Sequence, residues 1–142
     1  YTFFYSKSVE QAVDKVNKAG TTQVLTQTIL KTSSQKTVLW EDKSGDQRFF
    51  IQMLPRVIEP GWIDIRFTFG LDQAGKNIFM QADRLVLKNK QPASILGIWQ
   101  RIFNAVQMKE KLFNIPLFQS LKDNSENAEL LLLISPSWNL KD

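Results

Sequence analysis

The stretch Trp62-Ile63-Asp64-Ile65-Arg66-Phe67-Thr68-Phe69 alternates apolar and polar side chains more regularly than any other part of the 142-residue chain. Side chains of a β-strand point alternately to its two faces. The two isoleucines and two phenylalanines therefore share one face, and the acidic, basic and hydroxyl side chains between them share the other. This pattern predicts a strand with one buried face and one solvated face.

Runs rich in Thr, Val, Ile and Phe flank this strand, and turn residues bound each of them. Such runs predict antiparallel strands joined by short loops. In the run that ends at Leu87, Ile78, Met80 and Ala82 share one side, and the pattern slips near Arg84, which predicts a bulge or a bend there. We expect a meander of five strands, at Thr22–Lys31, Lys36–Glu41, Gln47–Leu54, Trp62–Phe69 and Lys76–Leu87.

The segment Pro55–Pro60 interrupts the meander and is predicted to be a loop, because a Pro-Gly pair at its end marks a tight turn. Val57 and Ile58 lie at its centre and would form a contact site if they are exposed. Trp62 falls on the polar side of the strand that follows. We therefore predict that Val57, Ile58 and Trp62 contact a partner.

Two helices and one last strand are expected outside the meander. Residues 8–18 have apolar side chains at helical spacing, and Ser8 and Gln11 form a capping box. Residues 94–107 place a wide apolar face, which includes Trp99 and Phe103, at spacings that suit a core helix packed on a sheet. Glu129–Ser135 is apolar without alternation, so it predicts a strand covered on both faces.

These elements give one α+β domain over residues 1–142. We expect a partial, lipocalin-like barrel made of an antiparallel meander, an N-terminal helix, a helix packed on the sheet and a C-terminal strand. Its interior is either a solid core or a small apolar ligand cavity. The side chains expected to line it are Ile63, Ile65, Phe67, Phe69, Ile78, Met80, Trp99 and Phe103.

The composition excludes several kinds of chemistry. The chain has no Cys and no His, so thiol and imidazole catalysis, zinc sites of those ligands and disulfides are absent. The glycines form no phosphate-binding motif, and the acidic residues lack metal-ligand spacing. Asp64, together with Glu59 or Asp83, is the candidate for acid-base work. We expect no catalytic residue, no cofactor and no metal.

The net charge of +4 is spread evenly, with nine basic and seven acidic residues in each half of the chain. No block of five or six like charges is present, and single-stranded binding would also require exposed aromatic side chains interleaved with the basic ones. We therefore expect no direct contact with nucleic acid.

The first five residues, Tyr1-Thr2-Phe3-Phe4-Tyr5, hold four aromatic side chains and no charge. Aromatic residues followed by a lysine are typical of the interfacial end of a membrane span, so we expect that an anchor precedes this chain in the full-length protein. In that case Tyr1, Phe3 and Phe4 contact a partner at the membrane. The alternative is a short first strand that packs on the core.

The layout resembles the extracytoplasmic companion subunits of membrane-anchored, ToxR-like transcriptional activators, of the ToxS and PsaF type. The features that carry the resemblance are the aromatic start, the helix at Ser8–Lys18, the meander at Thr22–Leu87 and the helix and strand that follow. The resemblance implies a non-enzymatic protein at the periplasmic face of the bacterial inner membrane. Such a protein would form a heterodimer with its regulator, stabilise it and help to transmit an environmental signal; PsaF-like members are associated with control of fimbrial genes.

The residues leave two further hypotheses open. A carrier or sensor of a small apolar ligand would use the aromatic inner face of the meander, capped by the second helix. An enzyme would need a carboxyl group held neutral by burial. The accessory subunit remains the first hypothesis, because five or six strands are too few to close a barrel of about eight strands, and the open sheet edges need cover.

The two tryptophans are expected to respond differently to truncation. Trp99→Ala should lower the free energy of unfolding by about 3–5 kcal/mol, because the core helix buries this side chain. Trp62→Ala should leave the melting temperature almost unchanged and weaken association with a partner. Thermal unfolding of both variants checks this, and equal melting temperatures would show that Trp62 has been assigned to the wrong face.

Overall fold

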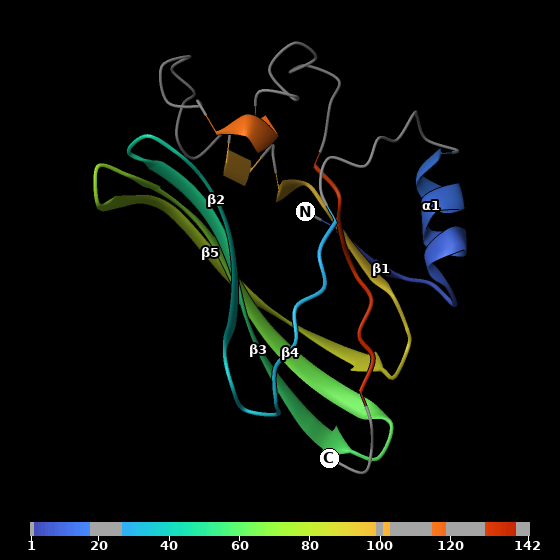
Figure 1. Ribbon diagram of the computed structural model, residues 1–142. Helices are drawn as coiled ribbons and strands as arrows, with labels where there is room; N and C mark the ends of the chain where they lie inside the picture. Colours follow the sequence, from blue (N-terminus) through green and yellow to red (C-terminus); the bar gives the residue numbers. More distant parts are fainter. Residues whose placement is uncertain (1, 18–26, 99–100, 103–114, 119–129, 139–142) are drawn as a thin grey trace.

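The computed structural model describes residues 2–17, 27–98, 101–102, 115–118 and 130–138 (Figure 1). Within them, two antiparallel sheets form, one of four strands and one of three. The four-stranded sheet is open and does not close into a barrel. The α+β class and the antiparallel meander are thus confirmed.

The meander contains four strands in sequence order, joined as successive hairpins (Figure 1). Three of the predicted strands are confirmed and are longer than expected. The strand predicted at Lys36–Glu41 starts two residues later and ends three residues later. The remaining predicted strand, Thr22–Lys31, is not observed among the described residues. Residues 27–31 are not in a strand, and residues 22–26 lie outside the described ranges. The observed bounds are β2 at Val38–Ser44, β3 at Gln47–Glu59, β4 at Trp62–Gln73 and β5 at Lys76–Lys88.

The expected loop at Pro55–Pro60 is instead mostly strand, since β3 continues to Glu59. Proline fits here because β2 starts opposite Met53, so the far end of β3 has no strand on that side. The Gln35 N–H donates to the carbonyl of Pro55 (2.7 Å), and the Val57 N–H donates to Oγ of Ser34 (3.1 Å). The chain before β2 thus satisfies this edge.

A bulge in β5 reverses the expected orientation of Met80. Leu71 lies opposite Phe79 while Asp72 lies opposite Asn77, so Ile78 is an extra residue in the ladder. Beyond it Phe79 is buried and Met80 is 57% exposed. The predicted place of Met80 in the interior is therefore wrong, and the irregularity occurs at Ile78 rather than near Arg84.

The three-stranded sheet has the order β1-β6-β7, with β1 at Thr2–Tyr5, β6 at Ala93–Leu96 and β7 at Leu132–Ile134. The aromatic start therefore forms the short first strand. The last strand is shorter than predicted and half-buried rather than covered on both faces.

The second helix was expected to start near Ser94, and this boundary is wrong. Residues 93–96 pair with a strand on each side, and this pairing outweighs their helical spacing. Gly97 follows with a φ of 92°, a conformation that favours glycine, and helical residues start at Ile98. Residues 103–107 of the expected helix lie outside the described ranges.

Helix α1 spans Val9–Asn17, as predicted. The Gln11 N–H donates to Oγ of Ser8 (3.1 Å), and the Lys7 N–H donates to Oε1 of Gln11 (2.7 Å). The cap expected at Ser8 is therefore present, and it satisfies backbone donors at the start of the helix.

The core lies on the inner face of the meander, which carries the odd-numbered side chains of β4. Rings from this face pack against each other and against the segment at residues 115–118, where Phe49 and Phe118 have centroids 5.0 Å apart. The Leu117 N–H donates to Oδ2 of Asp42 (3.2 Å), which ties that segment to β2. The core also includes β6, Ile98 and Ile102.

The outer face is not uniformly solvated. Phe50 projects from it but is only 6% exposed, because its ring lies across Gly70 of the next strand. A Cβ on Gly70 would meet Cζ of Phe50 at 2.5 Å and the carbonyl of Phe79 at 3.1 Å. The guanidinium of Arg48 covers the ring at 4.5 Å from its centroid. Gly70 is thus required by close approach.

Gly70→Ala should lower the free energy of unfolding by about 1–3 kcal/mol, because the added methyl group forces the Phe50 ring out of its place. Urea unfolding measures the change. In a Phe50→Leu background the same substitution should cost much less, since the shorter side chain does not reach Gly70. An equal cost in both backgrounds would contradict the steric explanation.

Candidate functional site

The end of the β3–β4 hairpin carries the residues predicted to contact a partner. Val57 and Ile58 are 39% and 40% exposed, and Ile58 is the extra residue at a second register shift. Trp62 is half-buried on the outer face, with Nζ of Lys88 5.2 Å from its ring centroid. All three side chains are therefore accessible at one end of the sheet, as expected.

The other predicted contact residues are in the aromatic start. Phe3 and Phe4 belong to β1 and lie opposite Ile95 and Ser94 of β6. Tyr5 ends the strand and is exposed. Tyr1 lies outside the described residues. The backbone of this segment is thus part of the smaller sheet.

The residues predicted to line the interior are brought together only in part. Ile63, Ile65, Phe67 and Phe69 are buried in a single core cluster, and Ile78 is half-buried against it. Met80 lies on the opposite face, and Trp99 and Phe103 lie outside the described ranges. A ligand cavity among these residues stays a prediction.

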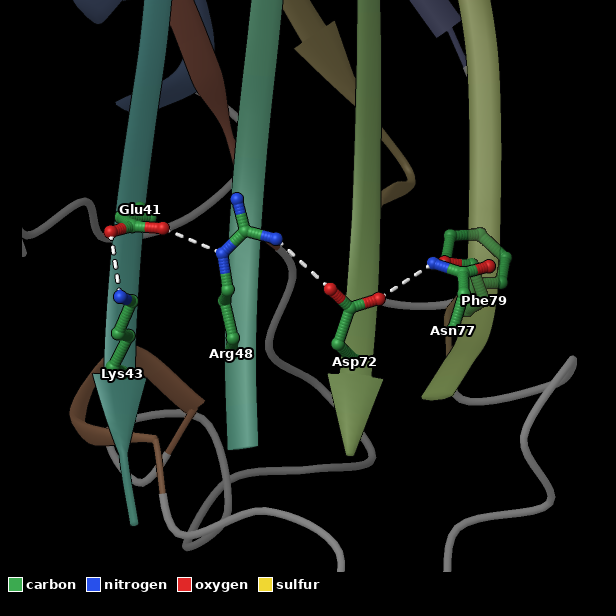
Figure 2. A network of polar contacts seen from close by, with 6 residues as sticks. All are labelled: Glu41, Lys43, Arg48, Asp72, Asn77 and Phe79. Carbon is green, nitrogen blue, oxygen red and sulfur yellow. Dashed lines mark hydrogen bonds and ion pairs between the residues drawn. The ribbon is translucent and has the colours of Figure 1, made fainter. Parts of the chain in front are cut away.

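A row of polar side chains crosses the outer face at the other end of the sheet, one or two from each strand (Figure 2). Glu41 accepts from Nζ of Lys43 (3.0 Å) and from Nε of Arg48 (2.6 Å). Asp72 accepts from Nη1 of Arg48 (2.9 Å) and from Nδ2 of Asn77 (2.9 Å). Two cations and two carboxylates are matched, so we name these residues the neutral row.

The neutral row perturbs two of its members. The hydrogen bond from Arg48, and then that from Lys43, lowers the pKa of Glu41. The same bond to Glu41 raises the pKa of Arg48. A lowered carboxyl pKa favours the folded state above its ordinary value of about 4.3, and this contribution is lost as the pH falls through the lowered value.

Asp64 was predicted to be solvated, and this is wrong. It lies on the outer face, yet its side chain is 2% exposed. Oδ1 accepts from Nε of Arg84 (2.8 Å), and Oδ2 lies 3.7 Å from Nη2 of Arg56. The two arginines cover the carboxylate and compensate its charge.

The carboxylates considered for acid-base work do not meet. Asp83 lies opposite Phe67, an inner-face residue, whereas Asp64 lies on the outer face. Oδ1 of Asp83 accepts from the N–H of Arg84 (2.8 Å). Glu59 lies opposite Trp62 at the end of the hairpin. Each of the three is thus held in separate surroundings.

Metal-binding clusters and bilayer-spanning helices are both absent from the residues that the structure describes. Across these ranges, no three acidic side chains gather in a way that would hold a metal ion. Among the same residues, no helix combines the length and the apolarity that crossing a bilayer requires.

The sequence did not reveal the contacts of Asp64, because they depend on cross-strand register. Arg56 lies directly opposite Asp64 on β3, and Arg84 is a diagonal neighbour on β5. The only signal was the presence of arginines in adjacent predicted strands. The neutral row was missed for the same reason.

Comparisons with protein families, with curated proteins and with solved structures found no match to this chain.

The ion pair at Asp64 should respond unequally to loss of either partner. Arg84→Met leaves a buried carboxylate with only the more distant Arg56, and should lower the free energy of unfolding by roughly 3 kcal/mol. Asp64→Asn leaves two half-exposed arginines and should cost about 1–2 kcal/mol. Urea unfolding measures both changes. Arg66→Met is the control and should change stability by less than about 0.5 kcal/mol; equal losses in the first two variants would contradict the asymmetry.

Proposed function

We propose that this protein is a non-enzymatic accessory subunit that binds and stabilises a membrane-anchored transcriptional regulator at the periplasmic face of the bacterial inner membrane. It forms a heterodimer with the regulator and helps to transmit an environmental signal. The observation that carries this proposal is the open edge of β5. Among the described residues, this strand of 13 residues pairs with β4 alone.

The register identifies which residues of β5 face that edge. Backbone groups of successive residues in an antiparallel strand point to alternate sides. The carbonyl of Pro55 accepts from Gln35, on the side away from β4, so even-numbered residues of β3 bond to β4. These even-numbered residues of β3 lie opposite even-numbered residues of β4, so the backbone groups of odd-numbered residues of β4 bond to β5. Their partners in β5 are also odd-numbered, so the backbone groups of the even-numbered residues 80–86 of β5 face the open edge.

The hydrogen bonding of Arg84 fits this assignment. Its N–H donates to Oδ1 of Asp83, a neighbour in the same strand, rather than to β4. The donors and acceptors that face outward can pair with a strand from another chain, and this is a common mode of peptide recognition. We therefore assign β5 as the docking strand for the regulator.

The accessible apolar side chains at the end of the β3–β4 hairpin support the same function. Val57, Ile58 and Trp62 are grouped there, and Trp62 lies opposite Lys88, the last residue of β5. A partner segment that pairs with β5 would reach these side chains by continuing across the end of β4 to Trp62 and then across the end of β3 to Val57 and Ile58. In this proposal these side chains add apolar contacts to the backbone pairing.

The carrier of a small apolar ligand is the alternative. It rests on the buried aromatic inner face of the meander, where Phe67 and Phe69 stack with centroids 6.3 Å apart. A lipocalin-like interior would require that this face leave space for a ligand. Native mass spectrometry distinguishes the alternatives, because a carrier would retain a ligand and an accessory subunit would retain a protein.

Ala82→Pro should abolish partner binding and leave the fold intact. Residue 82 is exposed, and its N–H faces the open edge, so proline removes a donor that β4 does not use. The measurement is capture of a membrane-anchored regulator from detergent-solubilised inner membranes by the full-length protein, with the bound protein identified by mass spectrometry. Capture should fall at least about tenfold, since strand addition depends on main-chain hydrogen bonds.

Ala82→Thr is the matched control, because it keeps the N–H and suits a strand. It should capture the regulator as the parent protein does. Equal capture by the proline variant would exclude strand addition at β5, and the absence of any membrane-anchored regulator from all captures would contradict the function.

A further inference from the structure

Three arginines lie together on the outer face, one on each of three adjacent strands. Arg56 lies on β3, Arg66 on β4 and Arg84 on β5, and Asp64 is buried among them. We name these four residues the arginine cluster. Two guanidiniums contact one carboxylate, and the third, that of Arg66, belongs to the same face of β4, so the cluster carries two uncompensated positive charges.

The register makes this excess more pronounced. Arg66 and Arg84 are directly opposite each other in the β4–β5 ladder. Side chains at such positions have Cβ atoms about 4.5–5.5 Å apart, and like charges there destabilise a sheet. Arg84 is held by Asp64, whereas no acidic side chain among the described residues lies within ion-pair distance of Arg66. The fold thus retains a pair of like charges in which Arg66 has no acidic partner among the described residues.

The neutral row on the same face provides the comparison. There every cation contacts a carboxylate, Lys43 within β2 and Arg48 across to β2 and β4 (Figure 2). The neutral row and the arginine cluster lie on the same face of the four-stranded sheet. The excess charge is therefore confined to the half of the face next to the β3–β4 hairpin.

We infer that the arginine cluster binds an acidic polypeptide segment of the partner. This inference rests on the proposed function and names the chemistry of the segment that docks there. A strand added to β5 would place its outward-facing side chains beside Arg84, on the same face as Arg66. Acidic residues at those positions would supply the missing negative charge.

The geometry suits carboxylates. The side chains of Arg56 and Arg84 are 51% and 55% exposed, although both contact Asp64. Asp64 therefore restrains two guanidiniums while leaving much of each accessible. A guanidinium has five N–H donors in a rigid fork that can bind a carboxylate through two parallel bonds. Because part of the ordering is already done, less entropy is lost when the segment binds.

A membrane surface fits these positions less well. If the exposed hairpin end entered a bilayer, Arg66 would lie roughly 17 Å from Gly61 at about 3.4 Å per residue. The headgroup layer is only about 5–8 Å thick on each side. Arg66, and Arg84 opposite it, would therefore lie beyond the phosphates, and Glu59 at the end of the hairpin would face the phosphates instead.

The test uses a fluorescently labelled peptide of alternating Glu and Ser, titrated with the protein at low salt and followed by anisotropy. Arg66→Gln should weaken binding at least about fivefold, because it removes a charge-assisted contact. Lys43→Gln removes the same charge from the neutral row on the same face, and should change the affinity less than twofold. The affinity of the parent protein should fall as salt rises.

Arg66→Glu is a second variant that separates binding from folding. The new carboxylate would lie opposite Arg84, so the melting temperature should rise while peptide binding is lost. A variant that loses both stability and binding would show that Arg66 has a structural role. Equal effects of the Arg66 and Lys43 variants, or no binding by the parent, would overturn the inference.

Two other probes identify competing ligands. If vesicles of anionic phosphatidylglycerol, or a short DNA duplex, bind more tightly than the peptide and lose binding in Arg66→Gln, the cluster recognises phosphate rather than an acidic segment. The peptide titration needs no regulator, so its failure is distinct from failure to capture a regulator. Capture without peptide binding would retain the proposed function and reject the acidic segment.

Discussion

Pairing of β4 with a strand on each side is the constraint on which the rest of the structure depends. Its odd-numbered side chains are all apolar between Ile63 and Leu71, so a register slip by one residue would expose the entire set. The same register determines every cross-strand neighbour on the opposite face. The register of β4 with its two neighbouring strands thus determines both the core and the arrangement of surface charge.

The outer face shows how differently that alignment can dispose of charge. In the neutral row, cations and carboxylates alternate over β2, β3 and β4. In the arginine cluster, one carboxylate pairs with two guanidiniums, and the third arginine, Arg66, lies opposite Arg84. Surface ion pairs contribute little stability each. For the exposed pairs, the pattern therefore says more about which surface the protein leaves available than about what stabilises the fold, whereas the pair at the buried Asp64 does stabilise it.

The sequence predicted most of the meander because alternation is a local signal, which neighbouring residues carry by themselves. It failed where a distant segment decided the outcome. Pro55 was assigned to a loop, but it lies in a strand, where its carbonyl accepts a hydrogen bond from the N–H of Gln35. Ser94 was assigned to a helix, but it lies in a strand that pairs with β1 and β7. Met80 was assigned to the wrong face because one inserted residue changes every later position. Asp64 was expected in solvent because its arginines lie on other strands.

The strand order of the smaller sheet has a consequence for how the chain folds. The meander joins neighbours in sequence, so it can form while synthesis continues, whereas β6 must find partners near both residue 2 and residue 134. Contacts of such long sequence separation form slowly, since closing a large loop has an entropic cost. A nascent chain would therefore hold a completed meander with its apolar inner face partly uncovered until Leu132–Ile134 left the ribosome, and during that interval the protein is most exposed to aggregation and most in need of a chaperone.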